Sequence, residues 1–203
     1  MKLTARANSN QENHWHALKN DGGKALEELY HLYANPLYNY GAKFTSDKEL
    51  IRDCIQSIFV TLWTRRSHLK QPDNVKNYLF KAFRHSIFKK ASLLNKHERY
   101  EETEHYHFNA AINFEEKLIK EENQLALQQR IQASLDQLSP RQREAIFLKF
   151  YEGLSYEEIA EVMDISVKGS YKLMARAIDG LRGQLDINDF SLLLFLLHAK
   201  FFN

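Results

Sequence analysis

Apolar residues recur at three- and four-residue steps along most of this chain, and residues that break helices are scarce. The 203 residues include only 7 Gly and 3 Pro. Long runs of alternating apolar and polar residues, which are typical of half-buried strands, do not occur. We therefore expect an all-α fold, in which each helix buries one apolar stripe against its neighbours.

Local capping signals divide this pattern into separate helices. Capping-box sequences begin at three serines, and one Asn-Pro pair has the order of an N-cap and a first helical residue. The serines are Ser46, Ser139 and Ser155, the pair is Asn35-Pro36, and Asn74 is a further candidate cap. The signals predict helices over residues 24–33, 36–45, 47–65, 75–92, 118–136, 140–151, 156–163 and 167–183.

The charges are segregated along the chain, although the net charge is only +2. Residues 65–97 contain nine basic residues and one acid, whereas residues 98–122 contain eight acids and three basic residues. The first block suggests a surface that binds a polyanion and the second a solvated connector. The alternative for the basic block is an ordinary exposed, charged helix. Residues 93–117 also lack a firm periodicity, so we expect a flexible acidic linker between two domains.

Several classes of protein fit this sequence poorly. The single cysteine, Cys54, permits no internal disulfide and suits a reducing cytosol. The longest apolar run, residues 192–197, is too short to span a bilayer, and the N-terminus has no signal-peptide core. Phosphate-binding glycine loops, nucleophile motifs and metal-ligand spacings are also absent from the sequence. We expect a cytoplasmic, nucleoid-associated protein without enzymatic activity, cofactor or metal.

Residues 153–183 have the spacing of a helix-turn-helix. A short helix is followed by a three-residue turn and a longer helix, whose apolar stripe runs from Ser170 to Leu181. The opposite face of the longer helix carries Lys168, Lys172 and Arg176. Such a helix fits the major groove of DNA, where its cations neutralise phosphates. Helix pairs of this geometry also occur in proteins that never touch DNA.

The N-terminal half contains two further helices with distinct faces. In the run DCIQSIFVTLW at 53–63, an apolar stripe lies opposite Asp53 and Gln56. In NVKNYLFKAFRHSIFKK at 74–90, aromatic residues alternate with lysines and arginines. Aromatic rings among cations suit single-stranded DNA, because bases stack on the rings. The alternative, which we accept for Leu79, Phe83 and Ile87, is that these apolar residues form core.

Taken together, these segments resemble the extracytoplasmic-function group of bacterial sigma factors. The run DCIQSIFVTLW is similar to the family's polymerase-binding helix, and NVKNYLFKAFRHSIFKK is similar to its promoter-melting helix. The segment from LDQLSPRQREAIFLKFYEGLS to residue 183 resembles sigma domain 4 almost throughout. The recognition-helix sequence SVKGSYKLMARA resembles sigma factors of Bacteroidota-type bacteria, and Ser57 stands where the family commonly has Glu.

The resemblance implies a domain layout and a function. Residues 1–20 form a tail, 21–92 sigma domain 2, 93–117 the linker, 118–185 sigma domain 4 and 186–203 an apolar C-terminal tail. The implied function is a sigma factor that binds RNA polymerase core and directs promoter recognition, DNA melting and transcription initiation. The implied partners are the clamp and flap of the polymerase, promoter DNA and a membrane-linked anti-sigma factor, without membrane insertion of the chain itself.

The resemblance also implies three sets of site residues. Those for polymerase are Asp53, Gln56, Phe59 and Trp63, of which the last two also suit a structural role. Those for the −10 element are Arg65, Arg66, Lys70, Asn74, Asn77, Tyr78, Lys81, Arg84 and Lys89. Those for the −35 element are Arg141, Arg143, Ser166, Lys168, Ser170, Tyr171, Lys172 and Arg176.

Two other functions remain open at this point. A dimeric regulator that binds operators would use the helix-turn-helix but has no use for the DCIQSIFVTLW and 74–90 segments. A sigma-derived interaction module that no longer binds DNA has no use for Lys168, Lys172 and Arg176. The C-terminal tail either folds back on the second domain or contacts a partner such as an anti-sigma protein.

Overall fold

The computed structural model describes residues 15–18, 22–94, 106–109, 122–191 and 193. Within these ranges the regular elements are all helices, which confirms the all-α prediction. The chain divides into two compact units, Met1–Thr103 and Glu104–Asn203. Among the described helices, none combines the length and apolar character needed to cross a membrane. The described residues also contain no cluster of three or more His, Cys, Asp or Glu side chains that would hold a metal ion.

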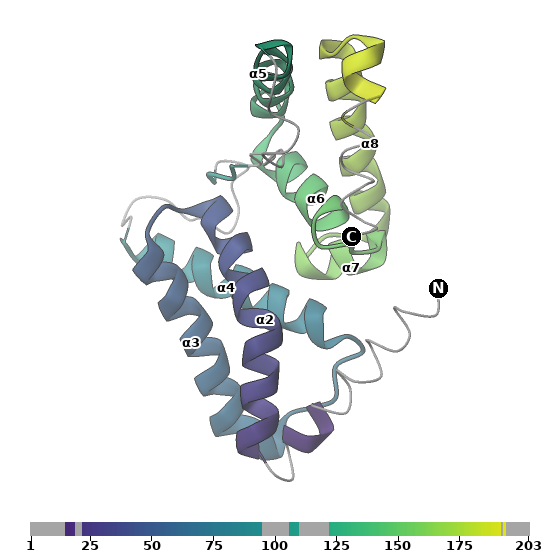
Figure 1. The fold of residues 1–203 in the computed structure, drawn as a ribbon. Coiled ribbons are helices and arrows are strands. Elements are labelled where there is room, and N and C mark those ends of the chain that lie inside the picture. Colours follow the sequence, from purple (N-terminus) through teal and green to yellow (C-terminus); the bar gives the residue numbers. More distant parts are fainter. Residues whose placement is uncertain (1–14, 19–21, 95–105, 110–121, 192, 194–203) are drawn as a thin grey trace. The chain divides into compact units, whose positions relative to one another are not determined.

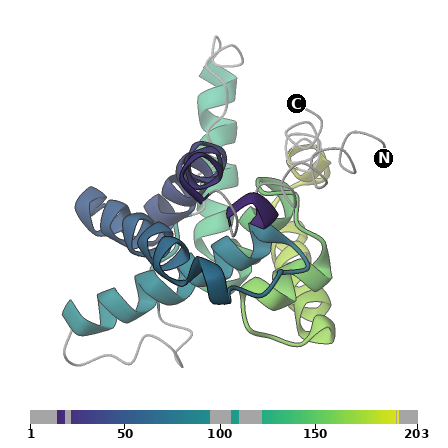
Figure 2. The same cartoon turned by 90° about the horizontal axis from the view of Figure 1, so that it is seen from below.

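Unit 1 is a bundle of three long helices, which lie side by side in Figure 1 and Figure 2. These are α2 (Gly22–Phe44), α3 (Lys48–Arg65) and α4 (Val75–Leu94), with a short 3-10 helix, η1 (Arg66–His68), after α3. Aromatic rings dominate the core. Tyr40 stacks on Phe80 with ring centroids 5.2 Å apart, and Phe44 meets Phe88 edge-on at 5.3 Å. Each large buried ring supplies much of the apolar area that stabilises so small a bundle.

The predicted break at Asn35-Pro36 is wrong, because α2 runs without interruption from Gly22 to Phe44 with Pro36 inside it. Proline inside a helix removes one hydrogen bond and costs about 3 kcal/mol. Tyr33, Leu37 and Tyr40 lie on one stripe around it and are all buried. Burying such side chains contributes roughly 1.5–3 kcal/mol each, so tertiary packing outweighs the local cost.

Most of the predicted caps are confirmed. Ser139 and Ser155 each form a complete capping box, and the Asn74 side chain accepts a hydrogen bond from the backbone N–H of Asn77 at 3.2 Å. The prediction for Ser46 is wrong by one residue. Asp47 is the N-cap of α3, and its carboxylate accepts hydrogen bonds from the backbone N–H groups of residues 49 and 50, both at 3.0 Å.

Unit 2 consists of four helices and the segments that flank them. The helices are α5 (Glu122–Asp136), α6 (Pro140–Phe150), α7 (Tyr156–Val162) and α8 (Val167–Gln184). Both α6 and α7 pack on α8. The stripe of α8 that faces them is formed by Ser170, Met174, Ala177 and Leu181, as its spacing predicts.

The C-terminal tail folds back on unit 2 as far as the structure describes it. Residues 187–191 are helical, and Phe190 and Leu193 are buried. The carboxylate of Asp189 accepts hydrogen bonds from Arg130 of α5, at 2.7 Å from Nε and 3.3 Å from Nη2. The described part of the tail therefore packs against its own unit. Residues 194–203 lie outside the described ranges.

Part of the predicted linker is not solvated. Tyr106 and Phe108 are buried, and the Phe108 ring meets that of Phe147 in α6 at 5.9 Å. The Tyr106 hydroxyl donates a hydrogen bond to the carboxylate of Glu144, which is fully buried. Residues 106–109 are thus an anchor on unit 2. The other residues of the predicted linker from 95 to 117 lie outside the described ranges.

The packing of unit 1 predicts an unusual cost for adding a methyl group to α2. A Cβ at Gly41 would lie 2.7 Å from Cζ of Phe83 and 2.8 Å from Cγ2 of Ile51. We expect Gly41→Ala to lower the free energy of unfolding by about 1–3 kcal/mol, although alanine normally stabilises a helix relative to glycine. Chemical denaturation measures this.

The matched control is Gly23→Ala in the same helix. A Cβ there meets nothing within 4 Å. We expect this variant to be unchanged or stabilised by up to about 1 kcal/mol. Equal unfolding free energies for the two variants would contradict the packing described for Gly41.

Candidate functional site

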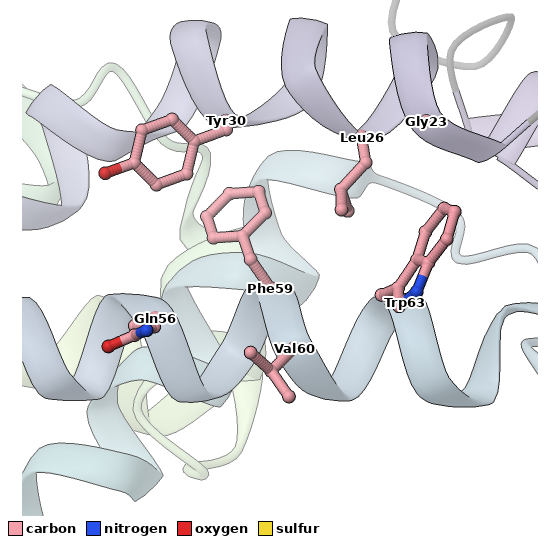
Figure 3. Close-up of a pocket in the computed structure, with 7 residues that line it drawn as sticks. All are labelled: Gly23, Leu26, Tyr30, Gln56, Phe59, Val60 and Trp63. Carbon is pink, nitrogen blue, oxygen red and sulfur yellow. The ribbon is translucent and has the colours of Figure 1, made fainter.

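A shallow groove of about 400 Å³ lies between α2 and α3 in unit 1. In Figure 3, Leu26 of α2 points toward α3, and Phe59 and Trp63 of α3 point toward α2, whereas Val60 points away from α2. The Tyr30 ring lies edge-on to Phe59, with centroids 5.1 Å apart. Phe59 is buried and forms the floor, whereas Tyr30 is 46% exposed and forms the rim. The groove is lined by Gly23, Leu26, Tyr30, Gln56, Phe59, Val60 and Trp63.

Trp63 closes one end of the groove and is held from two sides. A Cβ at Gly22 would lie 2.6 Å from the Trp63 ring, so the start of α2 touches the indole directly. On the other side the Arg66 guanidinium lies 4.2 Å from the ring centroid, and its Nη1 donates to the Trp63 carbonyl oxygen at 2.8 Å. The indole still remains 38% exposed.

The polar edge of the same face carries a positive charge from α4. The Lys90 ammonium lies 3.3 Å from the Ser57 hydroxyl, which itself donates to the Asp53 carbonyl oxygen at 2.6 Å. Beneath this edge, Cys54 is fully buried, and burial raises the pKa of its thiol. A buried thiol with a raised pKa is a poor nucleophile, which supports a packing role for Cys54.

The α4 helix keeps most of its aromatic side chains inside the bundle. Phe80 and Phe88 are buried, so they cannot stack on bases, and the prediction of an open stacking surface is wrong for them. They stand among cations in the sequence, but their rings complete the core with Tyr40 and Phe44. Leu79, Phe83 and Ile87 are buried, as predicted.

Tyr78 is partly exposed, and its ring lies edge-on to Trp15 at 5.2 Å. Tyr78 is the one aromatic residue of the predicted −10 set. Within the described residues its ring contacts Trp15 of the N-terminal segment.

The helix-turn-helix of unit 2 is closed by a short turn between α7 and α8. Asp164 adopts a positive φ of 51°, which aspartate tolerates better than most residues. The Ser166 side chain caps α8 by accepting from the N–H of Gly169 at 3.0 Å. The Ser170 hydroxyl lies 2.8 Å from the Tyr156 carbonyl oxygen, to which it donates a hydrogen bond. These bonds fix the longer helix on the shorter one.

The outer face of α8 combines cations with apolar side chains. Lys168, Lys172 and Arg176 are exposed, as predicted. Beside them Val167 is 42% exposed and Tyr171 is 49% exposed. This face can approach a polyanion while also presenting apolar surface to it.

The ring of Tyr171 is held against the start of α7. It lies 4.1 Å from the Tyr156 ring, on which the Lys149 ammonium rests at 4.7 Å from the centroid. The pKa of the Glu157 carboxyl is lowered, first by a hydrogen bond from its own backbone N–H and then by the Ser155 hydroxyl. The nearby Lys149 ammonium and the Tyr171 hydroxyl lower this pKa further.

A comparison with family models matches residues 128–179 to sigma-70 region 4. The chain is similar to the Bacillus subtilis (strain 168) ECF RNA polymerase sigma factor SigM, with 24% identity over 157 residues that cover 77% of this chain and 93% of SigM. It is also similar to RNA polymerase sigma factor SigZ of the same organism, with 22% identity over 161 residues that cover 79% of this chain and 87% of SigZ. The resemblance to extracytoplasmic-function sigma factors is confirmed.

Two solved structures share the fold of this chain. One is CnrH in complex with the cytosolic domain of CnrY, with a TM-score of 0.58 and 19% identity, covering 87% of this chain and 97% of the other. The second is the sigma factor RpoE in complex with the anti-sigma factor NepR from Bartonella quintana. Its TM-score is 0.56 at 22% identity, and it covers 81% of this chain and 99% of the other. The similarity to Bacteroidota-type members stays a prediction.

The structure brings the residues predicted to bind polymerase onto one face of α3. Asp53 and Gln56 are exposed, and Trp63 continues the same face about two turns beyond Gln56. Phe59 lies beneath Tyr30 and supports the face from below. Sequence reasoning missed Tyr30 and Val60. In the sequence, Val60 stands off the apolar stripe of its own helix, and this position was the available signal. In the structure the residue is 52% exposed.

Three of the predicted DNA contacts are buried and are therefore wrong as direct contacts. Asn77 is 2% exposed, and Arg84 lies with its guanidinium 4.4 Å from the centroid of the Phe88 ring. Ser170 is used between α7 and α8. A polar side chain need not face solvent when it can bond or stack inside the protein.

Two more of the predicted DNA contacts have side chains that already bond within the protein, which limits their availability to DNA. Asn74 caps α4, and the Arg143 Nη1 donates to the Asp136 carbonyl oxygen at 2.9 Å, where it supports the turn between α5 and α6. The remaining predicted contacts are exposed or half-buried and stay predictions. For the −10 element they are Arg65, Arg66, Lys70, Tyr78, Lys81 and Lys89, and for the −35 element Arg141, Ser166, Lys168, Tyr171, Lys172 and Arg176.

Proposed function

We propose that this chain is a sigma factor that binds RNA polymerase core and directs promoter recognition, DNA melting and transcription initiation. One observation carries the proposal. The same chain presents an open groove with a mixed apolar and polar rim on α3 and a cationic recognition helix in a separate unit. A regulator that binds operators on its own needs the second feature and has no use for the first.

The groove in unit 1 is the proposed binding site for the polymerase clamp. Exposed apolar side chains at Tyr30, Val60 and Trp63 are costly in water and are typical of a surface that meets a protein partner. Gln56 lines the groove and Asp53 is exposed one turn earlier on α3, so both are available for the polar contacts that fix orientation. An apolar groove between two helices suits a partner that is itself helical.

The loop from residue 65 to 74 and the outer face of α4 are the proposed −10 surface. Arg65, Lys70 and Lys89 are exposed there and can approach the phosphates of an opened strand. Capturing an unpaired base offsets the few kcal/mol, in order of magnitude, that its extrusion costs. Melting in this mechanism needs no nucleotide hydrolysis by this chain.

The recognition helix α8 is the proposed reader of the −35 element. Its N-terminal turn would enter the major groove, where Lys168 and Lys172 reach base edges or phosphates. Because unit 1 and unit 2 belong to one chain, binding at one promoter element raises the effective concentration of the other unit at its own element. The polymerase flap is the proposed protein partner of unit 2.

An anti-sigma factor is the proposed regulatory partner. CnrH and RpoE, the two solved structures with the same fold, are each in complex with another protein, which for RpoE is named as an anti-sigma factor. By analogy we expect an anti-sigma factor, linked to the membrane, to cover one of the exposed surfaces described here.

Transcription with purified components tests the proposal as a whole. We expect core polymerase supplemented with this chain to start transcription at a small set of defined sites on genomic DNA. Run-off products mapped at their 5′ ends measure this. A chain that confers no selection of start sites, but binds operators as a stable dimer, would contradict the proposal.

The polymerase-binding face predicts a separable defect. We expect the double variant Asp53→Ala with Gln56→Ala to associate roughly thirtyfold more weakly with core polymerase, because two polar contacts worth about 1 kcal/mol each are lost. Titration of labelled chain into core polymerase measures this. The control is Asn35→Ala with Asn39→Ala, two exposed amides on α2 away from the groove. Equal weakening of both double variants would mean that the groove is not the docking face.

The recognition helix predicts a change in salt dependence. Each phosphate contact contributes a slope of about 0.9 in log affinity against log salt. We expect Lys172→Ala with Arg176→Ala to lower the slope for promoter binding by the polymerase complex by up to about 2. The control is Arg182→Ala on the same helix, whose guanidinium lies 5.9 Å from the Phe190 ring centroid. An unchanged slope in the double variant would show that these side chains do not meet phosphates.

A further inference from the structure

An apolar strip runs along α8 beside its row of cations. The strip consists of Val167, Tyr171 and Ala175, which recur at four-residue steps and are all exposed. The cations Lys168, Lys172 and Arg176 each follow one residue later, about 100° further around the helix. The buried stripe of α8 borders the strip on its other flank, so the strip lies at the edge of the core and its side chains still remain exposed.

The central member of the strip is held in place before any partner binds. The Tyr171 ring lies 4.1 Å from that of Tyr156 at an interplanar angle of 31°, while nearly half of the Tyr171 side chain remains exposed. What Tyr171 offers a partner is thus a ring that is already held against α7. A preorganised contact costs little entropy on binding.

The chemistry of the major groove supplies a matching group. Among the base edges there, the C5-methyl of thymine is the apolar feature, and small apolar side chains contact it. The adjacent cation row keeps the strip close to a polyanion, whereas a protein partner for an apolar strip would be expected to meet fewer charges. Ala175 has the small side chain that allows the helix backbone to lie close to such a methyl group.

We propose that the strip formed by Val167, Tyr171 and Ala175 reads thymine methyl groups, so that the duplex element bound by unit 2 is defined partly by thymines. The inference deepens the proposed function and rests on it. In this arrangement Lys168, Lys172 and Arg176 supply affinity, and the strip supplies part of the sequence discrimination.

Replacing thymine by uracil in the promoter tests the inference, because it removes the methyl group and leaves base pairing intact. The probe is a duplex that carries a start site found by run-off transcription, with each thymine of its upstream element replaced singly by deoxyuridine. Binding by core polymerase loaded with the full chain is measured. At one or two positions we expect about fourfold weaker binding, the factor for losing one buried methyl group. Uracil in the transcribed region is the DNA control.

Variants of the strip assign the effect to side chains. In Val167→Ala the uracil effect is expected to disappear at one position, because the methyl group has lost its contact. Tyr171→Phe is expected to retain the uracil effects, since it keeps the ring. Ile187→Ala is the protein control: Ile187 is 72% exposed and lies outside α7 and α8, so all uracil effects are expected to persist.

The outcomes separate the inference from the proposed function. If the loaded polymerase binds its promoters but no uracil substitution in the upstream element weakens binding, the inference alone is overturned. The same holds if Val167→Ala weakens association with core polymerase and leaves the uracil effects intact, because the strip then meets protein. If the loaded polymerase shows no preference for any promoter, the proposed function fails and the inference fails with it.

Discussion

The burial of one stripe on each helix determines which side chains the molecule presents. In α8, Met174, Ala177 and Leu181 face α6 and α7, and the Ser170 hydroxyl fixes the rotation of the helix by bonding the Tyr156 carbonyl oxygen. Successive residues are 100° apart around a helix, so a shift by one residue would turn the cation row away from the outer face. The same constraint acts on α3, where the buried stripe leaves the edge that begins at Asp53 exposed. Both proposed surfaces are consequences of core packing on the opposite side.

Unit 2 is larger than the region that matches the sigma-70 family model. Upstream of residues 128–179, Tyr106 and Phe108 pack on α6, and downstream Asp189 and Phe190 close against α5 and α8. These flanking contacts enlarge the core of a small unit, which gains stability steeply with buried area.

The flanking contacts also shorten the stretch of chain between α4 and the first described residue of unit 2. The chain between the last described residue of α4 and the anchor is residues 95–105, whereas the sequence suggests a linker of residues 93–117. A shorter tether gives a higher effective concentration when it can still span both sites.

The sequence predicted local features better than tertiary ones. The caps at Ser139 and Ser155 follow from bonds between residues three apart, so the sequence alone contains the information. The helix α2 continues through Pro36 because the residues around this proline are buried against other helices of the bundle. Local sequence signals do not reveal this burial.

The errors in the candidate site have the same origin. Asn77 and Arg84 are polar, and polarity alone predicted exposure, but both are buried. Phe80 and Phe88 stand between cations in the sequence and yet complete the core with rings from α2. The sequence predicted residues on the α3 side of the groove but none on the α2 side. Tyr30 comes from α2 and reaches Phe59 only when the bundle forms.

In the proposed function, base capture falls mainly to the loop that follows α3, because the rings of Phe80, Phe83 and Phe88 in α4 are buried. That loop is not independent of the polymerase-binding groove. Trp63 lines the groove, and Arg66, at the start of the loop, rests on the Trp63 ring and bonds its carbonyl oxygen. A partner that fills the groove meets the same indole that supports Arg66, so in the proposed function polymerase docking and one cation of the −10 surface depend on the same side chain. The contacts between Arg66 and Trp63 already exist in the free chain, so this cation is positioned before a partner fills the groove.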